Sequence, residues 1–524
     1  MSRRSGVRLR RWLLAGALLT GLVARTPGIE WGMNFPSPSG FTIHHPDEWT
    51  HLVLAEPLIA PSDGARWTPR YPKGLAVMTA APIVAARAVR GALHAGRPVI
   101  RDTVRVGRVV SVLLGVASIF IVFLLGRRIT GDERVGLAAA WFLALGGLHV
   151  TQSHFFVADV PALFFTLLGL LLLLVDLDRG EEPGNEALRW AALSLGFAFG
   201  IKLFVAGMPS LALAVLLRRG RFRRATHAAV FFLAGFVIVN AGLFTPFDLL
   251  AAVRTGVNDP YTYDRAMGLL VYAIESPAIF GLPLLLLALG GTVMAVRRLL
   301  AGRKDRRVLA TAAVIGLPLL VHAWHVTFSL DLFPRHIVVF IPFAAIAAGF
   351  ALVRAGDALA RGRIRPALLA LPVFAWMALF VFDGERPFIA EPRNEAYRWL
   401  EANVPEGTNI WWYYHSLKRW PQMRFPRDGR PPYLVEEMMQ ANHILSGVGL
   451  RDSYPPDYHH VFDVLSQDEV DETQAVFKGE SEYREVARFR EGYFMPEYRW
   501  SDRMLGNRSR NYITELVIFE RQGT

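Results

Sequence analysis

Long apolar segments, separated by short polar ones, run through roughly the first 380 residues of the chain. A helix needs about 20 residues to cross the hydrocarbon core of a bilayer, and several of these segments reach that length. In lipid the backbone must satisfy its own polar groups, so each segment is predicted to be a helix. We expect about eleven crossings, at Trp12–Ala24, Val109–Leu125, Val135–Val150, Val160–Val175, Trp190–Ile201, Leu203–Leu217, Ala228–Phe244, Ile279–Val296, Val308–Phe328, Ile337–Val353 and Ala367–Phe382.

The pattern changes at Asp383, after the last of these segments. About 140 residues follow with many charges and no apolar run of membrane length. Asn394–Asn403 is amphipathic at helical spacing, and Asn409–Tyr414 and Tyr512–Phe519 are rich in the aromatic and β-branched residues typical of strands. The sequence therefore predicts an all-α polytopic membrane bundle over residues 1–382 and a small external α/β domain over residues 383–524.

Composition agrees with a membrane protein. Apolar residues make up 52% of the chain and charged residues 19%, against about 25% in soluble proteins. The net charge of +12 could suggest a nucleic-acid partner, but the arginines fall in short clusters between apolar segments and form no continuous stripe. We therefore expect no nucleic acid. The absence of cysteine excludes disulfides, thiolate chemistry and cysteine-bound metals.

The arginine clusters predict the orientation of the bundle, because such clusters mark cytoplasmic loops. They lie at Arg3–Arg11, Arg218–Arg224, Arg297–Arg307 and Arg354–Arg365. With Trp12–Ala24 as an anchor rather than a removed signal peptide, the N-terminus is cytoplasmic and residues 26–107 form one long external loop. This holds if Gly74–Val89, which alanines and Arg87 dilute, does not cross or crosses as part of a re-entrant pair. We expect a multi-pass protein of the plasma or inner membrane with its C-terminal domain outside.

Two carboxylate positions are external in this topology. His45-Pro46-Asp47-Glu48 begins an amphipathic stretch, and a carboxylate pair there can accept a proton from a hydroxyl group or bind a divalent cation. Asp159 precedes Val160-Pro161 at the head of an apolar segment. For both positions an ordinary helix N-terminus is the alternative, because proline and acidic residues are favoured in the first turn.

Three cations lie near the same predicted face. Lys202 interrupts the apolar stretch Ala191–Leu217, where an ionisable group is costly unless it is paired or reaches water. Lys73, before Gly74, and Arg335, after Pro334, would place positive charge at the outer interface, where an anionic head group could bind. The alternatives are a snorkelling lysine in a hairpin turn for Lys202 and lipid-facing anchors for Lys73 and Arg335.

Taken in order, these pieces resemble the class C glycosyltransferases of family 39, in the broad family that includes protein O-mannosyltransferases and aminoarabinose transferases. The matching motifs are His45-Pro46-Asp47-Glu48, Tyr71-Pro72-Lys73-Gly74, Arg105-Val106-Gly107-Arg108-Val109-Val110-Ser111, Ser153-His154-Phe155-Phe156-Val157-Ala158-Asp159-Val160-Pro161, Gly200-Ile201-Lys202 and Phe333-Pro334-Arg335-His336. The resemblance covers roughly residues 10–380. One departure is Pro72-Lys73, where relatives often have two consecutive prolines.

The resemblance implies an enzyme that moves a hexose or pentose from a polyprenyl-phosphate donor to an acceptor outside the cytoplasm. Asp47 would be the general base. Glu48 and Asp159 would be further acids of the site or ligands of a divalent metal ion. The donor phosphate would be bound by Lys73, Lys202 and Arg335.

Two other interpretations remain open from the sequence. A transporter or flippase for a lipid-linked or anionic solute is the first, although transporters usually place ionisable groups near the midplane, between repeats. In this chain only Lys202 interrupts an apolar core, and no internal repeat is detectable. The second is a membrane scaffold that presents the C-terminal domain.

Overall fold

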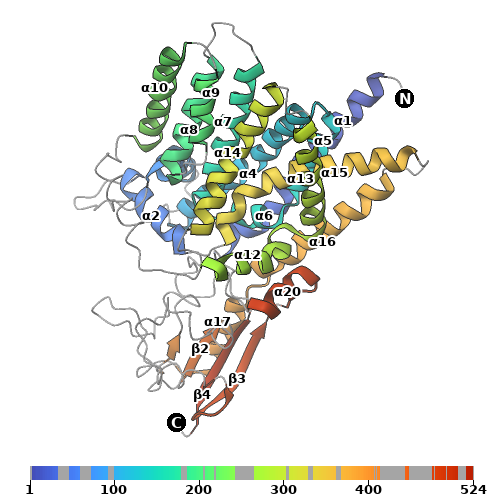
Figure 1. Ribbon diagram of the computed structural model, residues 1–524. Coiled ribbons are helices and arrows are strands. Elements are labelled where there is room, and N and C mark those ends of the chain that lie inside the picture. The colour runs from blue at the N-terminus through green and yellow to red at the C-terminus, as the bar shows by residue number, and fades with distance from the viewer. Residues whose placement is uncertain are drawn as a thin grey trace. The chain divides into compact units, whose positions relative to one another are not determined.

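A computed structural model gives the structure of the chain as two compact units (Figure 1). The helical unit comprises Met1–Ile29 and Asp47–Phe382, and the C-terminal unit comprises Glu30–Pro46 and Asp383–Thr524. The structure describes residues 3–32, 46–59, 72–92, 100–178, 186–203, 207–217, 220–241, 265–301, 306–328, 334–361, 367–405, 408, 410–412, 443–447, 475–476, 478–490, 492–505 and 515–522.

The helical unit contains helices throughout its described residues. Its α-helices are α1 (Arg3–Arg25), α2 (Pro46–Ile59), α3 (Gly74–Ala92), α4 (Ile100–Thr130), α5 (Glu133–Ala144), α6 (Gly147–Ser153), α7 (Asp159–Asp178), α8 (Glu186–Lys202), α9 (Met208–Leu216), α10 (Arg221–Asn240), α12 (Arg265–Phe280), α13 (Leu282–Ala301), α14 (Arg306–Phe328), α15 (Ile341–Arg361) and α16 (Ala367–Ile389). Two 3-10 helices, η1 (Pro27–Glu30) and η2 (Pro334–Phe340), follow α1 and precede α15. The last turns of α16 belong to the C-terminal unit.

Seven helices among the described residues are long and apolar enough to cross a membrane. The pair α5 and α6, bent by 59°, would be an eighth crossing if it counts as one span. The prediction of a helical, multi-pass membrane bundle is therefore confirmed.

The other three of the roughly eleven predicted crossings fall on shorter helices. α8 has 17 residues and α9 has 9, and the apolar part of α14, Val308–Trp324, is shorter than a full span. The sequence showed apolar content at these places, but not where each helix ends. α3, whose apolar part is Gly74–Val89, belongs to the same short class.

α8 packs closely between α7 and α10 (Figure 1). Its contact with α10 uses glycine on both helices: Gly196 faces the Phe232 carbonyl group of α10, and Gly235 of α10 faces the Leu193 carbonyl group of α8. A Cβ atom at either glycine would collide with backbone of the other helix. Small residues of this kind let helix backbones approach each other in membranes, where no hydrophobic effect drives them together.

A buried apolar cluster joins α2 and α3 to the bundle. Leu54 of α2 and Leu75 of α3 pack with Phe156, which precedes α7, and with Ile201 and Val239 at the ends of α8 and α10. All five side chains are buried. This cluster therefore fixes the ends of the helices that carry the charged motifs.

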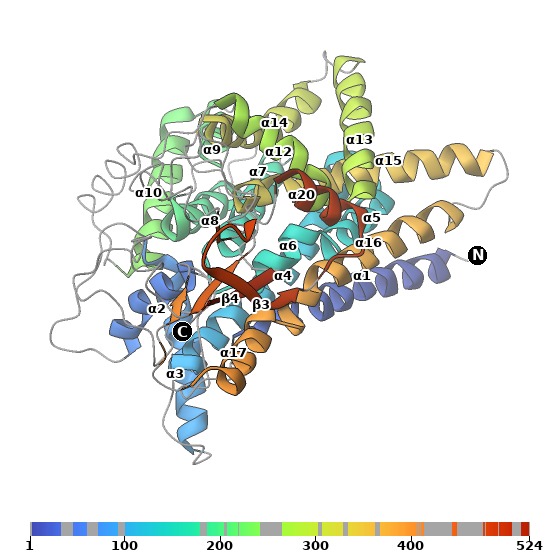
Figure 2. The ribbon, with the colours of Figure 1, turned by 90° about the horizontal axis from the view of Figure 1, so that it is seen from below.

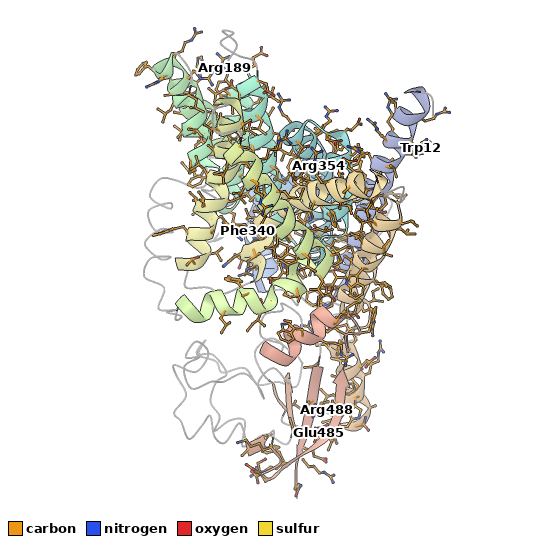
Figure 3. All side chains as sticks on the ribbon, turned by 45° about the vertical axis from the view of Figure 1, so that its right-hand side comes forward. Trp12, Arg189, Phe340, Arg354, Glu485 and Arg488 are labelled. Atoms are coloured by element: carbon orange, nitrogen blue, oxygen red, sulfur yellow. The ribbon has the colours of Figure 1, made fainter. Side chains whose placement is uncertain are left out.

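The C-terminal unit contains a four-stranded sheet in the order β1-β2-β4-β3. The strands are β1 (Ile410–Trp412), β2 (His443–Gly447), β3 (Tyr483–Arg490) and β4 (Glu515–Arg521). β1 and β2 run parallel, and β4 runs antiparallel to both β2 and β3. Glu485 and Arg488 form an ion pair on β3 (Figure 3).

Among the described elements, α17 (Pro392–Asn403) packs against β3 and β4 of this sheet (Figure 2). Its buried residues Ala396, Tyr397 and Leu400 meet Leu516 and Ile518 of β4. The helix predicted at Asn394–Asn403 and the strands predicted at Asn409–Tyr414 and Tyr512–Phe519 thus occur as α17, β1 and β4. The ends of these predicted strands at residues 409, 413–414 and 512–514 lie outside the described residues.

Trp31 belongs to the C-terminal unit although it lies far away in sequence. Its side chain is buried, and its indole N–H donates to the Glu391 carboxylate. The Arg393 guanidinium lies 5.0 Å from the centre of the indole ring, and Phe388 meets the ring edge-on at 5.2 Å. Trp31 is therefore bound within the C-terminal unit.

Candidate active site

Asp47 and Glu48 lie in the first turn of α2, immediately after Pro46. Both the helix-start interpretation and the site interpretation are compatible with this position. Consecutive helical residues point in directions about 100° apart. The two carboxylates accordingly have different surroundings, since Glu48 is completely buried and the Asp47 side chain is 28% exposed.

Glu48 forms a buried, bidentate ion pair with Arg108 of α4. Arg108 Nε donates to Oε1 at 2.7 Å and Nη2 donates to Oε2 at 2.8 Å. The Phe156 backbone N–H donates to the same Oε1 at 2.8 Å, and Arg108 Nη1 donates to the Ile29 carbonyl oxygen at 2.9 Å. Glu48 therefore holds together α2, α4, η1 and the segment that leads into α7.

Asp47 pairs with a residue from the other end of the helical unit. Arg335 Nη1 of η2 donates to Asp47 Oδ2, across 288 positions of sequence. η2 is held by α14, because the His322 ring lies 5.3 Å from that of Phe340 and its Nε2 meets the His336 carbonyl oxygen. The motif that begins α2 and the late Pro334-Arg335 motif thus meet.

A second ion pair joins Asp159 and Lys202. Lys202 Nζ donates to Asp159 Oδ1, and the aspartate is almost fully buried. Asp159 is the first residue of α7 and Lys202 the last of α8, so the antiparallel helices bring them to one end of the bundle. Leu203, with a left-handed φ of 52°, ends α8 directly after the lysine.

The two ion pairs form one charged network. The positive charge of Arg335 acts on the Asp159 carboxylate in addition to that of Lys202. Arg335 is therefore close to both aspartates. We call Asp47, Arg335, Asp159 and Lys202 the charged network below.

The backbone of Lys73 is linked to the part of α8 that carries Lys202. Its N–H donates to Asn240 Oδ1 at 2.8 Å, and Asn240 Nδ2 donates to the Gly200 carbonyl oxygen at 3.1 Å. Gly74 lies so close to the Gly200 backbone that a Cβ atom would collide there. The start of α3 is thereby joined to the Gly200-Ile201-Lys202 motif, and the Lys73 side chain is buried.

The segment before Asp159 is fixed from the other side by Arg25, the last residue of α1. This buried guanidinium lies 2.8 Å from His149 Nδ1, and its Nε donates to Ser153 Oγ at 3.2 Å. His154 packs against Gly28, where a Cβ atom would overlap the imidazole ring. Burial, with the Arg25 charge nearby, lowers the pKa of His154 to about 3. His154 is therefore neutral at physiological pH and adds no charge to the site.

Comparison with known proteins gives two findings. Residues 102–225 match the model of the dolichyl-phosphate-mannose-protein mannosyltransferase family. The chain is also similar to the structure of the Archaeoglobus fulgidus oligosaccharyltransferase in complex with Zn and sulfate, with a TM-score of 0.50 and 12% identity over 97% of this chain and 88% of that one. The chain has the class C glycosyltransferase fold. This confirms the resemblance expected from the motifs.

A further solved structure also matches along nearly the whole chain. ArnT from Cupriavidus metallidurans, bound to undecaprenyl phosphate, shares 15% identity over 100% of this chain and 99% of that one, at a TM-score of 0.49. Curated protein sequences give no significant match. The segment that matches the family model contains Arg108, Asp159 and Lys202, which form the ion pairs described above.

The metal role predicted for Glu48 and Asp159 stays a prediction, because both carboxylates are bound by cations of the protein in this structure. Both Glu48 oxygens accept hydrogen bonds from Arg108, and Oε1 also accepts one from the Phe156 backbone N–H. Asp159 faces a lysine and an arginine, whose charges disfavour a bound cation. Among the described residues, no cluster of three or more histidines, aspartates and glutamates is arranged to hold a metal ion.

No role was predicted from the sequence for three residues that support the candidate site: Arg108, which lies within a matched motif, and Arg25 and Asn240, which were not singled out. Each is a polar side chain within or at the end of an apolar helix, and each is completely buried. Such a group is expensive in a membrane unless it is paired, which was the available signal. Their partners could not be read from the sequence, because they lie on other helices.

Proposed function

We propose that this protein is a membrane glycosyltransferase that moves a sugar from a polyprenyl-phosphate donor to an acceptor hydroxyl group. The class C fold and the match to a family whose name includes dolichyl-phosphate-mannose support this reaction class. The observation that carries the proposal is the charged network, which gathers two aspartates and two cations at one end of the helical unit. A base and a phosphate-binding cation are what this transfer needs.

The network is proposed to lie on the non-cytoplasmic side. At the opposite ends of the same helices Arg128 of α4 pairs with Asp178 of α7, and Arg134 pairs with Asp357 of α15. The arginine-rich N-terminal turns of α1 also lie at this end, because Arg10 pairs with Glu133. Positive charge of this kind favours the cytoplasm, so the site is assigned to the outer face and the N-terminus to the inner one.

In the proposed step, the acceptor oxygen attacks C1 of the donor sugar and forms the new glycosidic bond. The bond between C1 and the phosphate oxygen breaks, and its electron pair leaves with the lipid phosphate. The acceptor proton passes to a carboxylate oxygen of Asp47. Arg335 and Lys202 stabilise the negative charge that develops on the phosphate, as preorganised cations do in such transfers.

The resting contacts imply a partner exchange in this step. Arg335 pairs with the proposed base, Asp47, and Lys202 pairs with Asp159. A donor phosphate would compete with both carboxylates for these cations. Its binding would free an Asp47 oxygen to accept the proton, so the donor is proposed to bind before transfer becomes competent.

The remaining site residues take supporting roles in this proposal. Glu48 holds Arg108 and positions the helix that carries Asp47, while Asp159 orients Lys202. The buried Lys73 is proposed to add positive charge behind the phosphate site and not to contact the phosphate alone.

The reaction can be tested with the purified chain in lipid nanodiscs. Radiolabelled mannosyl and arabinosyl polyprenyl phosphates would be offered with acceptor peptide, lipid or polysaccharide, and transfer of label to an acceptor would support the proposal. The rival function, transport or flipping of a lipid-linked or anionic solute, would be measured in parallel as flux across proteoliposomes. Flux of the lipid-linked sugar without transfer to any of the three acceptor classes would favour the transporter.

The donor role of the two cations gives a separate prediction. Arg335→Gln and Lys202→Gln should each raise the KM for the donor by about 10- to 150-fold, the loss expected from one charge-assisted hydrogen bond of about 1.5–3 kcal/mol. Initial transfer rates over a range of donor concentrations would measure this. Arg134→Gln, which breaks an exposed pair at the opposite end of the bundle, is the matched control and should leave the donor KM unchanged. A donor KM that is unaltered in both network variants would reject their assignment.

A further inference from the structure

The C-terminal unit carries two exposed aromatic side chains next to the end of a membrane helix. Phe494 and Trp500 are 45% and 50% exposed. Phe494 lies in residues 492–495, and Trp500 on α20 (Pro496–Leu505), the helix that follows directly. Large aromatic rings are costly to leave in water without a partner.

The backbone on both sides of Phe494 is bound to the last turns of α16. Asp383 Oδ2 accepts backbone N–H groups of Phe494 at 3.0 Å and Met495 at 2.8 Å. Arg386 Nη1 donates to the Gly492 carbonyl oxygen at 3.2 Å, and its guanidinium lies 5.8 Å from the centre of the Phe494 ring. The aromatic loop is thus fixed at the level of Arg386.

Buried contacts fix α20 in the same place. Tyr498 packs against Gly384 of α16 so closely that a Cβ atom at the glycine would collide with the phenol ring. The Tyr493 and Tyr498 rings lie 4.8 Å apart, and both are buried. Trp500, two positions after Tyr498 and so about 200° around the helix, lies on the opposite face, and Arg499 is also exposed.

α16 supplies the reference level of the membrane. It is part of an apolar stretch long enough to cross a bilayer, and Leu371, Leu379 and Phe382 are 73%, 51% and 58% exposed on it. Side chains of this type on a membrane helix face lipid. Arg386, one turn after Phe382, is the first cation beyond this face, and Ile389 follows at 67% exposure.

An arginine next to aromatic rings at the end of an apolar helix is typical of the zone where hydrocarbon gives way to lipid head groups. We propose that Phe494 and Trp500, with Arg386 and Arg499, form a lipid-binding surface that seats the C-terminal unit on the bilayer. The rings insert at the level of the head groups, and the two guanidinium groups bind lipid phosphates. This surface is independent of the charged network and of the transfer reaction.

The chain has no cysteine, so single cysteines can be introduced as unique labelling sites. Phe494→Cys and Trp500→Cys would each carry a nitroxide spin label in the full-length protein, with one copy per nanodisc. Collision with oxygen, which concentrates in lipid, would be compared with collision with a water-soluble nickel chelate. The control is Arg484→Cys on β3, where the wild-type side chain is 63% exposed.

We expect the ratio of oxygen to nickel collisions to be several-fold higher at positions 494 and 500 than at 484. A more anionic nanodisc lipid should raise it further at both positions and leave 484 unchanged. Equal ratios at the three positions would overturn the proposal, because the aromatic surface would then lie in water. Protection from both reagents at 494 and 500 would also overturn it, since a protein surface and not lipid would cover the rings. Normal spectra at 484 would show that the unit is folded in each comparison.

Discussion

Asp47→Asn should abolish sugar transfer while the protein binds polyprenyl phosphate more tightly. Loss of a general base costs about 10²- to 10⁴-fold in rate. The same change removes the carboxylate that competes with the donor phosphate for Arg335. An ion pair of this partial exposure is worth about 0.2–1 kcal/mol, so the donor affinity should rise by up to about fivefold. Single-turnover transfer and equilibrium binding of radiolabelled polyprenyl phosphate would give the two quantities.

The control for this variant is Asp357→Asn. Asp357 also pairs with an arginine, Arg134, but at the opposite end of the helical unit, and its loss should change neither quantity. The two outcomes separate two ideas. Near-normal transfer by Asp47→Asn would reject Asp47 as the base. Lost transfer with unchanged or weaker phosphate binding would reject only the partner exchange with Arg335.

Breaking the Glu48–Arg108 pair should cost about 3–5 kcal/mol of unfolding free energy, because the remaining partner is a charge buried without its counter-ion. Both side chains are completely buried, and the contact is bidentate. Glu48→Ala and Arg108→Ala should each show this loss in denaturant titrations of the protein in mixed micelles. Glu48→Met combined with Arg108→Met should recover much of it, since replacing a whole buried pair by apolar residues is often neutral or stabilising.

An exposed pair provides the comparison for Glu48 and Arg108. Arg10→Ala removes the Arg10–Glu133 contact, whose side chains are 46% and 35% exposed, and should cost about 0–1 kcal/mol. Glu48→Gln decides between structural and chemical roles for this acid. If that variant keeps the wild-type unfolding free energy and loses transfer, Glu48 takes part in the chemistry and its assignment as a positioning residue is wrong.

The apolar pattern predicted the helical bundle because a membrane imposes one rule on every segment that crosses it. It did not predict where helices end, and α9 shows the result: Leu203–Leu217 is apolar throughout, yet the helix is Met208–Leu216. The four residues of the charged network were all singled out from the sequence, since ionisable groups at such places are rare. Which cation pairs with which acid was not predictable, because Asp47 and Arg335 are 288 positions apart.

The charged composition after residue 382 predicted the C-terminal unit. It did not predict that the early segment Glu30–Pro46 belongs to the same unit. Nothing local in the sequence connects Trp31 to Glu391, which lies 360 positions later. The pairing depends on a single tryptophan whose indole N–H needs an acceptor when it is buried. Composition changes reveal a domain boundary, whereas an early segment that packs into a late domain leaves no such mark.

The position of Trp31 limits how the C-terminal tail of this protein can change in evolution. Because Trp31 is bound by Glu391 and Arg393, replacing the tail alone would leave this buried indole without its hydrogen-bond acceptor. A chimera that keeps the membrane helices but receives a foreign tail would lack the residues that bind Trp31. The tail and the segment that carries Trp31 are therefore expected to change together.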